Sequence, residues 1–357
     1  MPDGLEEVAA MAPMSRGARA RATAKRLTVP ALIVIPVLAF LLSLTLGRYH
    51  VSLRELFTLF GSKLGLTDAT VSEEVSTVIL HVRLPRILAA LLIGAGLALS
   101  GGAYQGMFRN PLVSADILGA SAGAGFGAAL GIMLSETVVV TQLLAVFFGL
   151  AAVLITYFLA GRLRRGDPTL FLVLTGILVG TVFTSFISIL KVLADPYDKL
   201  PAITFWLMGS LAAINLQDIL ILLGPMVIGG AALLIVRWHL NPLSFGEEEA
   251  RAMGAETAKL RAIVIGACTL MTASAVAIAG IVGWVGLVIP HLARGMVGPN
   301  YGKLLPVSAV VGGVYLLLVD DLARMIGPLE IPIGILTAII GAPFFIFLLA
   351  RTRRAWT

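Results

Sequence analysis

Long apolar runs recur along this chain, and they limit its fold more than any other feature. Each run has roughly the 20 mostly apolar residues that a helix needs to cross the ~30 Å hydrocarbon core of a bilayer. The composition agrees, because 58% of the residues are hydrophobic and only 13% are charged, whereas a soluble domain carries about 25% charged residues. We therefore expect an all-α polytopic membrane protein.

Ten runs qualify as transmembrane spans, and an even number places both ends of the chain on one side of the membrane. No small-residue cleavage site follows the first run, so we interpret it as a retained span and not as a signal peptide. We expect a single transmembrane domain over residues 29–350, between an N-terminal tail (1–28) and a C-terminal tail (351–357). The predicted spans are 29–46, 87–106, 117–134, 137–160, 169–193, 217–236, 260–280, 281–297, 304–320 and 331–350.

The basic residues are distributed unevenly between the predicted loops, and this indicates the orientation. With the N-terminus in the cytoplasm, 18 of the 26 Lys and Arg residues fall on the cytoplasmic side and 8 on the outer side. Cytoplasmic loops of membrane proteins are enriched in Lys and Arg, so we expect both termini to be cytoplasmic and the chain to lie in a bacterial inner membrane. The same bias explains the net charge of +6 without any binding of nucleic acid.

The longest charged segment between apolar runs, residues 237–261, has the pattern of a short capped helix. Ser244 precedes Glu247 by three residues, which is the spacing of a capping box. Glu247, Glu248 and Glu249 fall in the first turn, where the helix dipole favours negative charge, and Gly254 stands where a helix commonly ends. We expect a cytoplasmic helix of roughly nine residues, about 13 Å long.

Polar residues line one face of the fifth predicted span. Their spacing of i, i+3, i+4, i+7 and i+10 places them on a common side of a helix. Their hydroxyl groups can bond back to carbonyl groups of their own helix or of neighbouring helices. Alternatively they form the mildly polar wall of a water-filled path with a cation at its outer mouth. The residues are Thr181, Thr184, Ser185, Ser188 and Lys191.

Local patterns predict several further features. In the long outer segment 47–83, we expect a short amphipathic helix over 51–60 at the surface, and Pro85 favours a helix start. Arg109–Leu112 (Arg-Asn-Pro-Leu) has the composition of a turn. Glycines spaced four apart in the third span predict a face packed closely against another helix, namely Gly123, Gly127 and Gly131.

The sequence offers little support for an enzyme. It contains no phosphate-binding G-x-x-x-x-G-K-[ST] motif, no His, Cys and carboxylate set with metal-ligand spacing, and a single cysteine, Cys268. Asp320 and Asp321 lie near the outer end of a span, where solvation and an ion pair with Arg324 explain them, and Glu330 is typical of a helix start. We expect no catalytic residue, no metal site and no cofactor bound by this chain.

Several blocks of the sequence, in order over residues 83–350, resemble the FecCD-type permease subunits of type II ABC importers for ferric siderophores, haem and cobalamin. The blocks are Arg83–Arg86, Gly96–Gly101, Gln105 with Arg109–Leu112, Ile117–Gly119 with Gly123 and Ala124, Trp206–Ser210, Gly246–Arg251 with Gly254, Val282–Arg294, Asp320–Arg324, and Glu330–Gly334 with Gly341–Phe344.

The resemblance implies a homodimer with the translocation path on its two-fold axis. It also implies two cytoplasmic ATPase subunits, which bind ATP and Mg, and a periplasmic substrate-binding protein. The segment 237–261 then couples to the ATPase through Ser244, Gly246, Glu247, Glu248, Glu249, Ala250, Arg251 and Gly254. Arg83, Arg86 and Arg324 are implied to dock the binding protein, and the polar face of the fifth span to line the path. Lys191 and Lys199 near the outer mouth suit an anionic chelate or a haem propionate.

Two positions depart from the family pattern. Many members have Pro after the acidic residue that follows the Arg-Asn-Pro-Leu block, and here Asp116 is followed by Ile117. Trp284 stands where many members have Phe. The alternative function is an ion-coupled secondary transporter, which requires buried carboxylates near the middle of the membrane, and the predicted mid-span positions carry almost no charge. A non-transporting scaffold or an enzyme gives no account of the segment 237–261.

Overall fold

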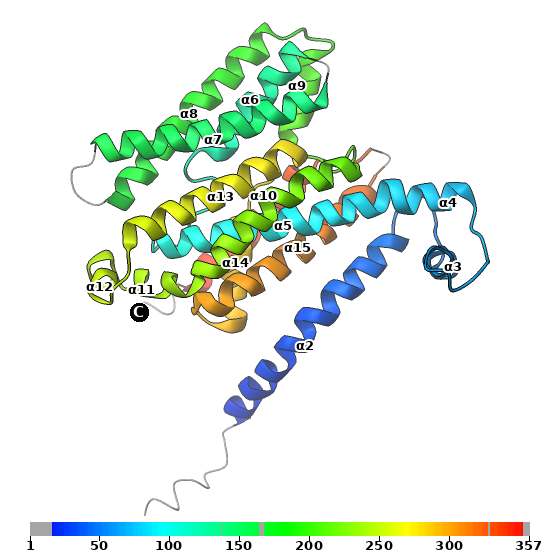
Figure 1. Ribbon diagram of the computed structural model, residues 1–357, viewed down its shortest axis with the longest axis horizontal. Helices are drawn as coiled ribbons and strands as arrows, with labels where there is room; N and C mark the ends of the chain where they lie inside the picture. The colour runs from blue at the N-terminus through cyan, green and yellow to red at the C-terminus, as the bar shows by residue number, and fades with distance from the viewer. Residues whose placement is uncertain (1–15, 136, 164–167, 328, 353–357) are drawn as a thin grey trace, which may run out of the picture.

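The computed structural model describes residues 16–135, 137–163, 168–327 and 329–352, and all regular elements within these ranges are helical (Figure 1). Six of these helices are long and apolar enough to cross a membrane, and four shorter apolar helices accompany them. The prediction of an all-α polytopic membrane protein is therefore confirmed, whereas the number of spans and their orientation stay predictions. Parts of both predicted tails, residues 1–15 and 353–357, lie outside the described residues.

Long helices make up most of the structure. They are α2 (Arg16–Thr45), α5 (Leu84–Met107), α6 (Ala120–Leu134), α7 (Val138–Leu163), α8 (Pro168–Leu193), α10 (Leu216–Val236), α13 (Thr257–Ala279), α14 (Val285–Val297), α15 (Tyr301–Met325) and α16 (Ile333–Thr352). The short helices between them are α3 (Leu53–Lys63), α4 (Glu73–Thr77), α9 (Lys199–Met208), α11 (Leu240–Leu243) and α12 (Glu247–Ala252).

Helix α5 runs through the middle of the bundle and is buried along most of its length. It packs against α10, α13, α14 and α15. Helices α6 to α9 form a second group on one side, and α2 lies on the opposite side (Figure 1). Helix α13 joins the two groups, because it contacts α5 and α10 as well as α6 and α7.

Close helix contacts depend on glycine, as the sequence predicts for the third span. A Cβ atom on Gly127 would lie 2.1 Å from the Leu144 carbonyl oxygen of α7. Gly123 and Gly131 make similarly close approaches to α7, so the predicted packing face is confirmed. The same device joins α5 to α15, where a Cβ atom on Gly94 would lie 2.2 Å from the Gly312 carbonyl oxygen.

The second predicted span is longer at its outer end than the sequence indicates. Its helical stretch runs from Glu73 to Met107 through α4, the turn Val78–Arg83 and α5. Pro85 stands in the first turn of α5, as predicted, but other helical turns precede it. A proline inside an α-helix clashes with the carbonyl group four residues earlier. Here the preceding turn, Val78–Arg83, is π-helical, and a π turn changes the backbone spacing just before the ring.

Other boundaries also differ from the predicted ones. Helix α14 begins at Val285 instead of 281, because Trp284 has a left-handed backbone (φ 69°) that precedes the first helical turn. The Trp284 side chain packs on Gly341 and lies edge-on to Phe345 of α16, with 6.4 Å between ring centroids. Helix α15 continues beyond 320 to Met325.

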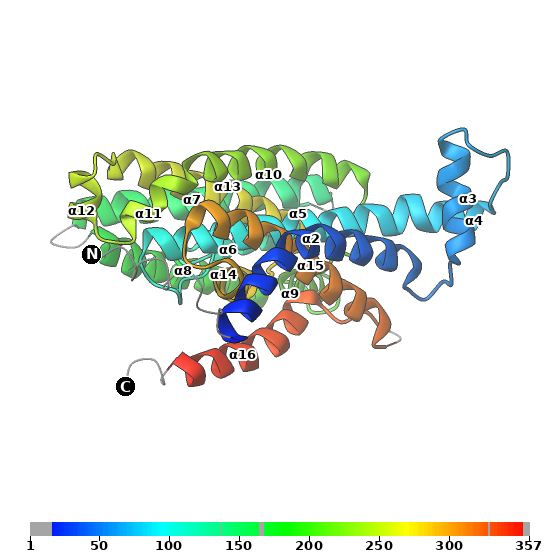
Figure 2. The ribbon, with the colours of Figure 1, turned by 90° about the horizontal axis from the view of Figure 1, so that it is seen from below.

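The outer segment contains the predicted amphipathic helix. It is α3, which begins at Leu53 and buries Leu56 and Leu59. Ser52 caps the helix, and the Glu55 side chain accepts a hydrogen bond from the Ser52 backbone N–H (2.8 Å). Helices α3 and α4 lie at one end of the bundle, and α11 and α12 lie at the other (Figures 1 and 2). The segments that the sequence assigns to opposite sides of the membrane are therefore at opposite ends of the molecule.

Candidate functional site

The segment 237–261 folds into short helices that are fastened to long helices on both sides. Glu247, the first residue of α12, accepts hydrogen bonds from Arg261 (2.7 Å) and Thr257 (3.3 Å) of α13. Asn241 in α11 accepts one from the Tyr301 backbone N–H at the start of α15 (2.9 Å). A displacement of this segment would therefore act directly on α13 and α15.

The charge of Glu247 is stabilised by its neighbours. Burial by itself raises the pKa of this carboxyl group, but the hydrogen bond and charge of Arg261, with the charge of Arg251 and the hydroxyl of Thr257, lower the pKa below its ordinary value. Glu247 therefore remains an anion that joins α12 to α13 at neutral pH.

The start of α12 differs from the predicted capping box. Ser244 ends α11, and its hydroxyl donates to the Asn241 carbonyl oxygen (2.6 Å) instead of capping the next helix. Gly246 occupies the N-cap position with a φ of 139°, which a side chain rarely tolerates. The helix is consequently six residues long and not about nine. The capping box is wrong because Asn241–Ser244 already forms a turn of its own.

The end of α12 agrees with the prediction. Gly254 has a φ of 83°, and its N–H bonds to the Arg251 carbonyl oxygen (2.9 Å). The next N–H, of Ala255, bonds to the Ala250 carbonyl oxygen (2.9 Å). This pair of bonds is the Schellman motif, for which glycine is the favoured residue.

Several side chains of this segment point to solvent. Glu248, Glu249 and Arg251 are exposed, whereas Gly246 and Ala250 are buried. Two large apolar side chains next to α12 are also exposed, Phe245 by 72% and Met253 by 56%. We did not single these two out from the sequence, although large apolar residues on both sides of an acidic helix are a signal of a contact surface.

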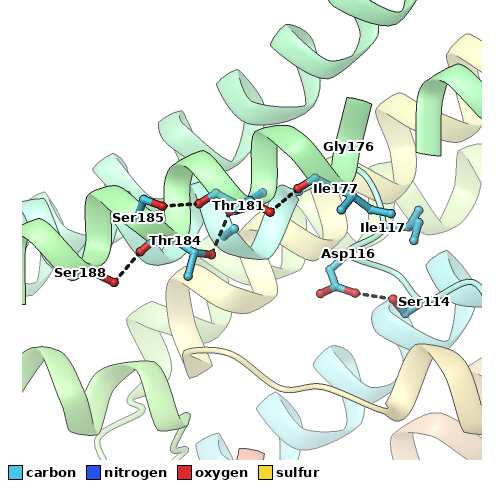
Figure 3. Close-up of a pocket in the computed structure, with 12 residues that line it drawn as sticks. Ser114, Asp116, Ile117, Gly176, Ile177, Thr181, Thr184, Ser185 and Ser188 are labelled. Atoms are coloured by element: carbon cyan, nitrogen blue, oxygen red, sulfur yellow. Dashed lines mark hydrogen bonds between the residues drawn. The ribbon is translucent and has the colours of Figure 1, made fainter. Parts of the chain in front are cut away.

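The polar residues of the fifth span line a groove on α8. Figure 3 shows four hydroxyl side chains along this groove, opposite the loop between α5 and α6. The groove has a volume of about 450 Å³. Each hydroxyl donates to the carbonyl oxygen four residues earlier on α8, at 2.9–3.0 Å, which confirms the first of the two interpretations. They are Thr181, Thr184, Ser185 and Ser188.

Bonding to their own helix does not remove these hydroxyls from the groove, because all four remain exposed. Lys191 lies further along α8 and does not line the groove. Two residues that the sequence did not single out as lining a path do so, Ser114 and Asp116. The Ser114 hydroxyl lies 2.5 Å from a carboxylate oxygen of Asp116, and Asp116 is the charged residue among those that line the groove.

Three arginines predicted at the outer surface are instead buried, with exposed fractions of 3% to 7%. Arg86 donates to Asp320 (2.8 Å) and pairs with Glu330 (2.9 Å). Arg324 pairs with Asp321 and lies 3.3 Å from Asp320, without the alignment of a hydrogen bond. The third arginine, Arg83, donates to the carbonyl oxygens of Leu44 (2.5 Å) and Tyr49.

These contacts correct two expectations. Arg83, Arg86 and Arg324 do not present their charges at the surface, because each guanidinium group is used within the chain. Asp320 and Asp321 do form the predicted local ion pair with Arg324, but they are buried and not solvated. The cluster joins α5 to α15, and the Ser43 hydroxyl of α2 donates to Asp321 (2.6 Å). Its position between three helices indicates a structural role.

Comparison with known proteins identifies the family. The sequence pattern of the FecCD transport family matches residues 33–351, which is nearly the whole chain. The chain belongs to the FecCD transport family. As a FecCD protein it is a type II ABC importer permease, and it is a multi-pass integral membrane protein.

Individual relatives of this FecCD protein cover most of its length. It is 40% identical to the molybdate import system permease protein MolB of Haemophilus influenzae, over 90% of this chain and 95% of that protein. It is 35% identical to the ferric enterobactin transport system permease protein FepD of Escherichia coli, over 93% of this chain and 98% of that protein. The solved structure of a metal-chelate-type ABC transporter in an inward-facing conformation is also similar. It has 40% sequence identity and a TM-score of 0.81, over 90% of this chain and 98% of that chain.

Proposed function

We propose that this FecCD protein is the membrane-spanning subunit of an ATP-driven importer, and that two copies form a homodimer. Two ATPase subunits bind ATP and Mg and contact the α12 end, and a periplasmic binding protein delivers substrate to the α3–α4 end. The observation that carries this proposal is α12 itself. It is a largely exposed helix bonded to α13, and the neighbouring α11 is bonded to α15, in a sequence that has no phosphate-binding motif of its own.

The contacts of the segment suggest how ATP binding elsewhere moves this chain. A partner that displaces Phe245, Met253 or the exposed face of α12 also displaces α13, because the hydrogen bond between Glu247 and Arg261 joins the two helices. Helix α13 contacts both helix groups, so its displacement changes how α6–α8 sit against α5. Such a rearrangement between two packed states is the usual response to a ligand that binds one state better.

We infer that the cargo is a metal compound. The relatives MolB and FepD are named for molybdate, a metal oxyanion, and for ferric enterobactin, a ferric siderophore. From the sequence we expected a cargo of the iron–siderophore, haem or cobalamin type. The groove on α8 offers hydroxyl groups and one carboxylate, and the cations Lys191 and Lys199 lie outside its lining. Neutral hydroxyl groups can form hydrogen bonds to an oxygen-rich compound without binding it tightly. Weak binding is needed along a transport path, because the compound must also leave.

Replacement of Glu248–Ala252 by a Gly/Ser linker tests the proposal. The linker removes α12 but leaves Glu247, Gly254 and the long helices intact. In the reconstituted complex we expect ATP hydrolysis to continue while ATP-driven uptake is lost. Uptake at the rate of the unmodified protein would contradict a coupling role for α12.

A further inference from the structure

Helix α3 carries an apolar stripe that nothing in the described chain covers. Leu56 and Leu59 face the bundle and are 2% exposed. On the adjacent side, Leu53, Phe57 and Leu64 are 59%, 69% and 73% exposed. Their spacing of four and seven residues places the three side chains in one row along the helix. Such a row is stabilised only by a non-aqueous neighbour.

The position of α3 indicates which neighbour this is. Figure 1 shows α3 end-on, and Figure 2 shows it lying across the direction of α5 and α10. A helix that lies across a bundle of spanning helices is parallel to the membrane surface. The chain reaches α3 from the end of α2 through Tyr49, which is 45% exposed. Helix α2 itself exposes Val34, Leu38 and Leu42 by 52–56%, as a lipid-facing helix does.

The charges beside the stripe fit a lipid surface. At about 100° per residue, Arg54 lies beside the stripe, and Lys63 is the last residue of the helix, next to Leu64; both are exposed. Long basic side chains at such positions extend to lipid phosphates while their methylene groups stay near the apolar boundary. The carboxylate of this helix, Glu55, is directed to the Ser52 cap and not to the stripe.

We propose that α3 is an interfacial helix that binds the outer surface of the membrane. It inserts Leu53, Phe57 and Leu64 at the boundary between headgroups and acyl chains, and it places Arg54 and Lys63 on lipid phosphates. The proposal does not depend on the transported cargo.

Site-directed fluorescence in lipid nanodiscs tests this placement. The one native cysteine, Cys268, is buried, so a new surface cysteine can be labelled selectively in the full chain. A Phe57→Cys variant receives the polarity-sensitive fluorophore NBD in nanodiscs of phosphatidylethanolamine and phosphatidylglycerol. An Asp68→Cys variant, on the exposed loop after α3, serves as the matched control.

We expect the label at position 57 to emit at shorter wavelength than the control label. It should be quenched strongly by lipids with a nitroxide near the headgroup and weakly by aqueous iodide, and the control label should show the opposite order. A label at position 57 that iodide quenches as strongly as the control overturns the proposal. A label shielded from both quenchers also overturns it, because a second copy or a protein partner then covers the stripe.

A second variant tests the contribution of the two cations. Arg54→Glu with Lys63→Glu, added to the labelled Phe57→Cys chain, reverses the charge beside the stripe and at the end of the helix, and both positions are exposed. We expect a loss of quenching by the nitroxide lipids and a gain of quenching by iodide. Unchanged quenching would overturn the assignment of Arg54 and Lys63 to lipid phosphates.

Discussion

At the scale of single residues, buried charges are the most consequential feature of this protein. Asp320 has no exposed surface, and the guanidinium groups of Arg86 and Arg324 surround its carboxylate. Removing one partner of a buried ion pair leaves an uncompensated charge in a medium of low polarity, which costs about 3–5 kcal/mol. Replacing both partners by apolar residues avoids that cost.

Asp320→Asn is therefore expected to destabilise the protein. The variant should show a clearly lower thermal unfolding midpoint in detergent, because Arg86 loses its principal partner inside the bundle. Arg86→Met combined with Asp320→Leu should recover most of the loss, since Arg324 still pairs with Asp321. Asp68→Asn, at an exposed position, is the control. An Asp320→Asn protein as stable as the control would show that the cluster does not hold α5 to α15.

Glu247 allows a second test at this scale. Its side chain is 22% exposed, so we expect Glu247→Gln to weaken the attachment of α12 to α13 by about 1 kcal/mol. This corresponds to roughly five-fold faster hydrogen exchange of the α12 amides. Glu248→Gln, at an exposed position of the same helix, should leave the exchange unchanged.

The same attachment should depend on pH. The pKa of Glu247 is lowered in the folded loop, so its contribution is fully present above the ordinary glutamate pKa and is lost as the pH falls through the lowered, folded-state pKa. Protection of the α12 amides, corrected for intrinsic exchange, should decrease over that acidic range in the unmodified chain and not in Glu247→Gln. Equal pH profiles would contradict this role of Glu247.

At the scale of elements, the helices are positioned by how closely their backbones approach. The α6–α7 pair depends on glycines that face α7 at backbone contact distance, and α5 meets α15 in the same way. Such contacts are typical of helices in lipid, where small residues let neighbouring helices pack. Other glycines, such as Gly266 of α13, face open space and have no such role.

This difference predicts opposite effects of the same substitution. Gly127→Ala should separate α6 from α7, because its Cβ atom would lie 2.1 Å from the Leu144 carbonyl oxygen, and we expect a loss of about 1–3 kcal/mol. Gly266→Ala should be neutral or stabilising by up to about 1 kcal/mol, because alanine favours a helix. Thermal unfolding of both variants in the same detergent is the measurement. A Gly127→Ala protein as stable as Gly266→Ala would mean that the helices separate without cost.

At the scale of the whole molecule, the two ends of the bundle differ in character. One end has the fastened, partly apolar segment around α12, and the other has α3 and α4 beyond the end of α2 (Figures 1 and 2). The groove on α8 lies between them, along the α8 helix. This arrangement fits the proposal that an ATPase contacts the α12 end and that substrate is delivered at the α3–α4 end.

Energy coupling is the property to measure at this scale. With its ATPase subunits in proteoliposomes, the complex should import cargo when ATP is supplied and should continue after an uncoupler collapses the ion gradients. It should stop when the ATPase subunits are omitted. Uptake that stops with the uncoupler and survives omission of the ATPase would favour an ion-coupled secondary transporter instead.

The sequence by itself determined the class of fold, the positions of the long helices and the end of α12. Hydropathy and glycine spacing can be interpreted from neighbouring residues alone. Gly254 likewise ends α12 by a hydrogen bond to Arg251 in the same helix. Tertiary structure alone decided the rest. Sequence spacing offered the Ser244 hydroxyl two local partners, and it bonds to Asn241 in the turn that the Tyr301 N–H holds against α15. Arg83, Arg86 and Arg324 have the composition of a surface patch, but the packing of the helices buries all three. Arg86 meets Asp320, 234 residues further along the chain. Arg83 donates to backbone carbonyl groups of Leu44 and Tyr49, and Arg324 pairs with the aspartates of its own helix. Charge alone does not reveal whether a partner lies within the same chain, because that depends on which helices pack together.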